Sequence, residues 1–123
     1  MNEEEVRAFC RSFPGVKEDV KWEDHLCFMI GEKMFTIVAL ENKSSMSFKV
    51  DEEDFYQLTE TDDFVPAPYL ARYKWVYTED FTQIPSNDLK QLLQKAYDII
   101  KAKLPKKKLR EIESQLMDQK DRS

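Results

Sequence analysis

The stretch that decides the fold is residues 26–40, LCFMIGEKMFTIVAL, in which two apolar runs flank a single glycine. Runs rich in Phe, Ile and Val, bounded by a turn residue, are typical of β-strands. Gly31 fits the first central position of a two-residue type II′ turn, whose twist matches that of the flanking strands. The sequence therefore predicts a β-hairpin in which Ile30 faces Lys33.

Successive side chains of this hairpin alternate between its two faces. In the predicted register, one face carries Leu26, Phe28, Ile30, Phe35 and Ile37, and the other carries Cys27, Met29, Met34, Thr36, Val38 and Leu40. The first set is bulkier, so we expect it to face the core. The second set is then expected to line an uncovered face of the sheet.

Further strands and helices are expected on both sides of the hairpin. Helices are predicted at residues 2–13, 51–60, 86–104 and 106–119, a strand or extended segment at 16–25, and strands at 46–50 and 74–77. Strands joined by short loops favour antiparallel pairing, and the long helices need an apolar surface to cover. The predicted fold class is therefore α+β, an antiparallel sheet with helices packed on one face. Within the strand at 46–50, Lys49 is expected to point outward.

Length and composition predict a single domain over residues 1–123, with 109–123 as a C-terminal helical extension. The chain has 123 residues, 41% of them hydrophobic, and only two cysteines, which are expected to be reduced core thiols. No apolar run is long enough for a signal peptide or a membrane span, so we expect a cytoplasmic protein with no membrane partner. The net charge of −5 is uneven: residues 1–64 sum to −9 and residues 65–123 to +4.

The chain lacks the residue patterns of the common catalytic sites. His25 is its only histidine, no GxSxG motif surrounds a serine, and two isolated glycines cannot build a phosphate-binding loop. We therefore expect a protein that is not an enzyme and has no cofactor. Acidic residues lie near the N-terminus, at Glu3, Glu4, Glu5, Glu18, Asp19, Glu23 and Asp24, and a solvated acidic face is favoured over a metal site.

The most unusual segment is VPAPYLARYKWVY, residues 65–77, which combines three tyrosines and a tryptophan with Arg72 and Lys74. Proteins that bind single-stranded nucleic acid use this mixture, because aromatic rings stack on bases while cations hold phosphates. The structural alternative is a long connection held extended across the sheet by its prolines, with Trp75 packed as an anchor. Both interpretations stay open for Arg72 and Lys74.

An ordered series of short motifs resembles the MmcQ/YjbR family of small bacterial proteins. The series comprises PGV at 14–16, WED at 22–24, GEKMF at 31–35, SFKV at 47–50, VPAPYLARYKWV at 65–76, and AYDII followed by LPKK between 96 and 107. Together they cover about residues 3–108. The resemblance implies a fold similar to that of frataxin (CyaY-like), and a function in DNA binding.

The resemblance also indicates which residues are expected to matter, namely Trp22, Lys33, Phe35, Lys49, Pro66, Arg72, Lys74 and Trp75. We predict a nucleic-acid site formed by Lys33, Lys49, Arg72 and Lys74, with Trp75 as platform or anchor, in a protein expected to be a monomer. The partner is DNA or another anion. Two alternatives remain: an acidic, frataxin-like iron site, and a protein-interaction module that uses the apolar uncovered sheet face around Met29.

Overall fold

The computed structural model describes residues 1–40 and 43–121. Its elements are, in order, α1 (Glu3–Arg11), β1 (Val16–Lys21), β2 (His25–Ile30), β3 (Lys33–Ala39), β4 (Met46–Lys49), α2 (Glu52–Thr59), β5 (Val65–Pro66), the 3₁₀ turn η1 (Ala71–Tyr73), β6 (Trp75–Thr78), the 3₁₀ turn η2 (Phe81–Gln83), α3 (Ser86–Ala102) and α4 (Lys106–Asp121). None of the described helices is long and apolar enough to cross a membrane.

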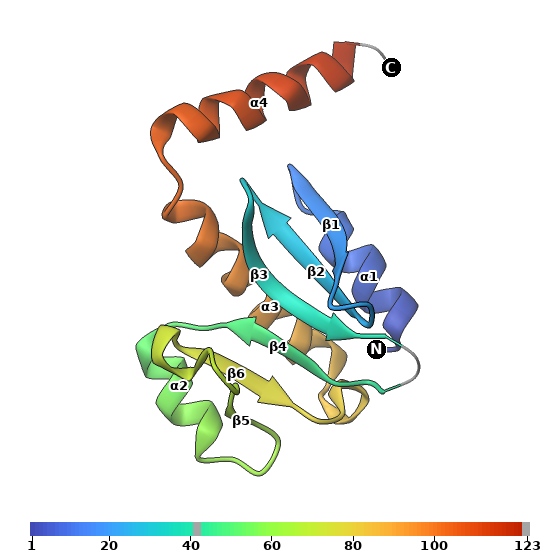
Figure 1. Cartoon of the computed structure of the whole chain (residues 1–123), viewed down its shortest axis with the longest axis vertical. Coiled ribbons are helices and arrows are strands. Elements are labelled where there is room, and N and C mark those ends of the chain that lie inside the picture. The colour runs from blue at the N-terminus through green and yellow to red at the C-terminus, as the bar shows by residue number, and fades with distance from the viewer. Residues whose placement is uncertain (41–42, 122–123) are drawn as a thin grey trace.

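The described residues form one antiparallel sheet of six strands in the order β1-β2-β3-β4-β6-β5. Helices α1 and α3 lie behind this sheet in Figure 1, on the face opposite the viewer. Their apolar sides, with Val6 on α1 and Leu89 and Leu93 on α3, are fully buried in the main core together with Phe28 and Phe48 of the sheet. The predicted α+β class, with helices on one face of an antiparallel sheet, is confirmed.

The hairpin between β2 and β3 forms with the predicted pair of Ile30 and Lys33, but its turn differs from the predicted one. Gly31 has φ +57° and Glu32 has φ +71°. Positive φ at both central residues is the mark of a type I′ turn, whereas type II′ needs it only at the first. The turn prediction was therefore wrong in type, although its two-residue length was right.

A β-bulge at Phe35 changes the register of the hairpin. Met29 faces Met34 as predicted, but Phe28 faces Thr36 and not Phe35. One extra residue in β3 reverses the alternation beyond it. Ile37 therefore packs on the face away from α1 and α3, and Val38 packs in the main core, the opposite of the predicted assignment.

The sheet face away from α1 and α3 is partly covered by residues that follow β5. There Cys27 and Ile37 are buried in a small second cluster with Ala67 and Trp75, and Leu70 packs against it. The prediction of an uncovered apolar face was wrong for this part of the sheet. The covering segment is also a compact loop rather than an extended crossing, since two residues of β5 pair with β6 before the chain turns back through η1.

Helix α4 lies across the end of the sheet at which the β2–β3 hairpin turns (Figure 1). Ile112 of α4 and Leu104 just before it are buried in the main core. Both approach glycines closely: a Cβ atom on Gly15 would lie 2.6 Å from Ile112 Cγ2, and one on Gly31 would lie 2.7 Å from Leu104 Cδ1. The first part of the predicted extension is thus packed against the domain.

Candidate functional site

Two of the five predicted site residues, Arg72 and Lys74, lie in the loop that joins β5 to β6. Arg72 belongs to η1, and Lys74 ends that turn in the left-handed region with φ +62°. Hydrogen bonds from Lys74 N to Ala71 O and from Val50 N to Lys74 O, both 2.9 Å, hold the loop against the end of β4. The backbone around the two cations is therefore well anchored.

Both cations lie over aromatic rings. The guanidinium carbon of Arg72 is 4.7 Å from the centre of the Tyr73 ring. Lys74 Nζ is 5.0 Å from the ring centre of Phe55 and 5.2 Å from that of Tyr56, both on α2. These distances are typical of cation–π interactions, which hold each positive charge beside the face of an aromatic ring.

Tyrosine side chains of α2 and of the β5–β6 loop are open to solvent. Tyr69 is 99% exposed, while Tyr56 and Tyr73 are 54% and 51% exposed. Tyr69 also has φ +66°, a costly conformation for a residue with a side chain. We call Tyr56, Tyr69, Arg72, Tyr73 and Lys74 the tyrosine–cation surface. It offers exposed rings together with two positive charges.

Lys49 does not point into solvent as predicted, since its side chain is buried. Its position opposite Trp75 in the β4–β6 ladder places it beneath the β5–β6 loop, where Nζ donates a hydrogen bond to the backbone carbonyl of Tyr73. Burial lowers the pKa of Lys49 first, and the positive charges of Lys103 and Lys74 lower that pKa further. Lys49 thus adds positive charge from beneath the surface.

Trp75 is buried, with an exposure of 5%. It packs with Cys27, Ile37 and Ala67 in the second cluster, so its ring is not available for stacking on a base. Of the two predicted roles, platform or anchor, the structure places Trp75 as the anchor of the loop.

Lys33 lies apart from the other cations. Its partner in the hairpin, Ile30, belongs to the main core on the helix-covered face, whereas the β5–β6 loop covers the opposite face. Lys33 itself is exposed. The four predicted cations therefore do not form one surface: Arg72 and Lys74 lie together, Lys49 lies beneath them, and Lys33 is outside the group.

The predicted site residues included no tyrosine, although the three tyrosines of residues 65–77 were recognised as part of a mixture that can stack on bases. Tyr56 was harder to find, because its proximity to Lys74 depends on how α2 packs beside the loop. One feature of the sequence could have indicated Tyr56. It is an aromatic residue directly after Phe55, the buried residue of α2, and so falls outside the buried side of that helix.

The predicted alternative of an acidic metal site has no support in the geometry. Among the described residues, no group of three His, Cys, Asp or Glu side chains is placed to hold a metal ion. Glu18 instead forms a 2.7 Å ion pair with Arg7 of α1, and Arg7 first of all holds the pKa of Glu18 below its usual value. Glu5 forms a capping box with Asn2.

Comparison with known proteins identifies one protein family. The model of the YjbR family matches residues 11–99, which is most of the chain. No curated protein matches the sequence.

Two solved structures have a similar fold. A Deinococcus radiodurans protein with a DUF419 domain is 23% identical, with a TM-score of 0.78, over 89% of this chain and 86% of that one. A Pseudomonas syringae protein is 15% identical, with a TM-score of 0.66, over 81% of this chain and 99% of that one. At these identities the similarity concerns the fold alone.

Proposed function

This chain belongs to the YjbR family, and from that premise we propose that it is a non-enzymatic protein that binds nucleic acid at the tyrosine–cation surface. The observation that carries the proposal is the pairing of Arg72 and Lys74 with exposed tyrosine rings. Cations hold the phosphates of a strand, and aromatic rings stack on its bases.

Single strands suit this surface better than duplexes. Tyr69 and Tyr73 can stack only on bases that are not already stacked within a helix, and a single strand presents such bases at little cost. Arg72 and Lys74 add a charge attraction that does not depend on base sequence. We therefore expect little sequence preference and tighter binding to single-stranded than to double-stranded DNA.

The charge around Lys49 supports the same proposal. Its ammonium group has three N–H donors, and the described hydrogen bonds use one of them, to Tyr73 O. None of Lys49, Lys74 and Lys103 forms an ion pair with a described residue. Positive charge without carboxylate partners attracts phosphate, although the net charge of −5 predicts weak binding that needs low salt.

The test is a fluorescence anisotropy titration of labelled oligothymidine and of a labelled duplex with the whole chain at low salt. We expect micromolar binding of the single strand and weaker binding of the duplex. Replacing both cations in the variant Arg72→Gln/Lys74→Gln should weaken binding about tenfold, since two phosphate contacts are lost. Tyr69→Ala should weaken binding by about 1 kcal/mol or more, the value of one stacked base.

The matched control is Lys17→Gln/Lys90→Gln, which changes the net charge equally. Both lysines are exposed, and Lys90 also lies over an aromatic ring, with Nζ 5.8 Å from the centre of the Phe9 ring. This variant should bind oligothymidine as the wild type does. Absence of binding at micromolar protein, or an equal loss in the control and the Arg72→Gln/Lys74→Gln variant, would overturn the proposal.

A further inference from the structure

We propose that the groove between α2 and α3 docks a basic amphipathic helix of a partner protein. The groove has a volume of about 460 Å³ and is lined by α2, by the segment that follows it and by the first half of α3. Its residues differ from those of the tyrosine–cation surface. The inference therefore goes beyond nucleic-acid binding and can be tested separately.

The floor of the groove is apolar. Phe64 and Ile84 form its buried part, with exposures of 5% and 6%. Leu58 of α2 and Leu92 of α3 are half-buried, and both pack against the main core. A floor of aliphatic and aromatic side chains between two helices suits the apolar side of a third helix.

The rim of the groove is acidic. Asp54, Asp63 and Asp88 all line it, and Lys95 is the one cation among the described residues that do so. Asp54 is already paired with Lys95, whereas Asp63 and Asp88 take part in no ion pair with a described residue. Two unpaired carboxylates beside an apolar floor favour a partner with Lys or Arg on both sides of an apolar stripe.

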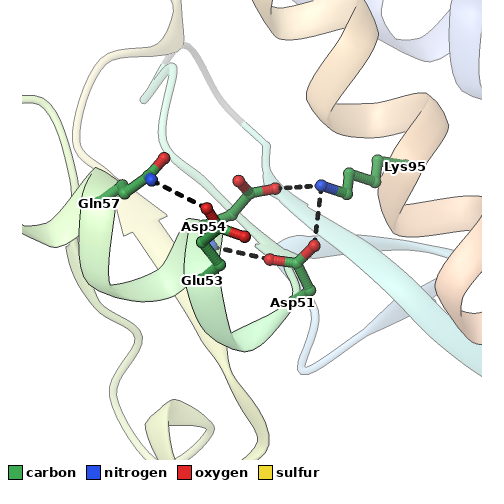
Figure 2. Close-up of polar contacts among 5 residues, drawn as sticks. All are labelled: Asp51, Glu53, Asp54, Gln57 and Lys95. Atoms are coloured by element: carbon green, nitrogen blue, oxygen red, sulfur yellow. Dashed lines mark hydrogen bonds and ion pairs between the residues drawn. The ribbon is translucent and has the colours of Figure 1, made fainter.

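A three-residue ion cluster braces the groove. Lys95 Nζ lies 2.8 Å from Asp51 Oδ2 and 2.7 Å from Asp54 Oδ2, and so joins the start of α2 to the middle of α3 (Figure 2). Asp51 also accepts a hydrogen bond from Asp54 N as the N-cap of α2. The cluster links the two helices without a partner present, which favours a groove that is already formed before a partner arrives.

The recognition follows from these two features together. An apolar stripe on the partner would cover Leu58 and Leu92, while its basic residues would reach Asp63 and Asp88 at the rim. Nucleic acid is excluded from the same groove because its phosphates would meet those carboxylates. The two surfaces therefore select partners of opposite charge.

The experiment measures anisotropy of a fluorescein-labelled amphipathic helix built from Leu and Lys, titrated with the whole chain. A peptide of the same composition with its apolar stripe scrambled is the first control, and a Leu–Glu version is the second. We expect saturable binding of the Leu–Lys helix and much weaker binding of both controls. Equal binding of the scrambled peptide would mean charge attraction alone and would overturn the proposal.

Variants locate the binding site. Asp63→Asn/Asp88→Asn should weaken binding of the peptide about fivefold, because two rim charges are lost. The matched control Glu23→Gln/Glu113→Gln changes the net charge equally at exposed positions outside the groove and should bind as the wild type does. Equal losses in the two variants would contradict docking in the groove. Sedimentation velocity tests whether a second copy of this chain occupies the groove instead. Self-association that is abolished by Asp63→Asn/Asp88→Asn would show such a second copy and would overturn the proposal.

Oligothymidine binding separates this inference from the proposed function. The Asp63→Asn/Asp88→Asn variant should keep that binding, and Arg72→Gln/Lys74→Gln should keep the peptide binding. If one variant lost the binding of both oligothymidine and the peptide, the two surfaces would not be independent. That result would overturn the proposal of a separate docking groove.

Discussion

Lys49 Nζ donates a hydrogen bond to the backbone carbonyl of Tyr73, which joins β4 to the loop that carries the tyrosine–cation surface. The lysine is buried, and the charges that lower its pKa are those of Lys103 and Lys74. A cation in this position costs free energy of desolvation. In return it holds the loop in place and raises the positive potential beneath Arg72 and Lys74.

The buried lysine predicts a dependence of stability on pH. The folded pKa of Lys49 lies below the ordinary value of 10.5, so between the two values the unfolded chain binds more protons and stability rises with pH. Lys49→Met removes this contribution. The free energy of unfolding in urea, measured for both proteins from neutral pH up toward 10.5, should therefore shift in favour of the wild type as pH rises.

The control for this measurement is Lys90→Met, which changes an exposed lysine of α3. Its difference from the wild type should show no comparable trend. Parallel curves for the wild type and Lys49→Met across the whole range would contradict the burial of the Lys49 ammonium.

The Lys95 cluster predicts a second dependence of stability on pH, of the same sign but in the acid range. Lys95 first of all lowers the pKa of Asp51, so the stability that this pair provides is complete above the ordinary value of 3.8 and is lost as pH falls through the lower, folded value. The three side chains are partly exposed, so Lys95→Met should cost only about 1 kcal/mol at neutral pH. Urea unfolding should show this difference shrinking well below pH 3.8, and a difference that persists in strong acid would count against the ion pairs.

The geometry of the hairpin turn predicts that substitutions at Gly31 and at Glu32 affect stability in different ways. Gly31→Ala places a Cβ atom at positive φ and 2.7 Å from Leu104 Cδ1, so it should destabilise the fold by about 1 kcal/mol or more. Glu32→Gly relieves a side chain from φ +71° and should leave stability unchanged or slightly higher. Thermal unfolding of both variants tests this. A harmless Gly31→Ala would contradict the type I′ turn packed under Leu104.

The two tryptophans predict distinct fluorescence. Trp75 is 5% exposed and Trp22 is 65% exposed. Trp22→Phe should therefore leave an emission that is blue-shifted and poorly quenched by acrylamide, whereas Trp75→Phe should leave a red-shifted and readily quenched one. Oligothymidine should not quench Trp75 in the Trp22→Phe variant, because the ring is covered by the loop. Direct quenching there would show that Trp75 serves as a stacking platform.

Sequence patterns predicted the elements that local spacing controls. The β2–β3 hairpin, the helix predicted at residues 2–13 and the long helix that became α3 follow from periodicity and capping within a few residues. The bulge at Phe35 could not be predicted, because either register of β3 places apolar residues on both faces. Only packing against α3 and Trp75 decides that Val38 and not Ile37 enters the main core.

The candidate site was predicted only where its residues are neighbours in the sequence. Arg72 and Lys74 are neighbours in sequence, so their proximity needed no tertiary information. The burial of Lys49 depends on the loop that returns about 24 residues later to cover β4, and the contact of Tyr56 with Lys74 depends on α2. The exclusion of Lys33 depends on which face of the sheet that loop covers.

The most direct test of nucleic-acid binding is the salt dependence of oligothymidine affinity, because it counts phosphate contacts. The logarithm of the binding constant should fall linearly with the logarithm of salt concentration, by about 0.7 for each phosphate contact on a single strand. We predict that the slope for Arg72→Gln/Lys74→Gln is smaller than that of the wild type by about 1.4, for two lost contacts. Lys17→Gln/Lys90→Gln should keep the wild-type slope. A slope unchanged by loss of Arg72 and Lys74 would contradict phosphate binding at the tyrosine–cation surface.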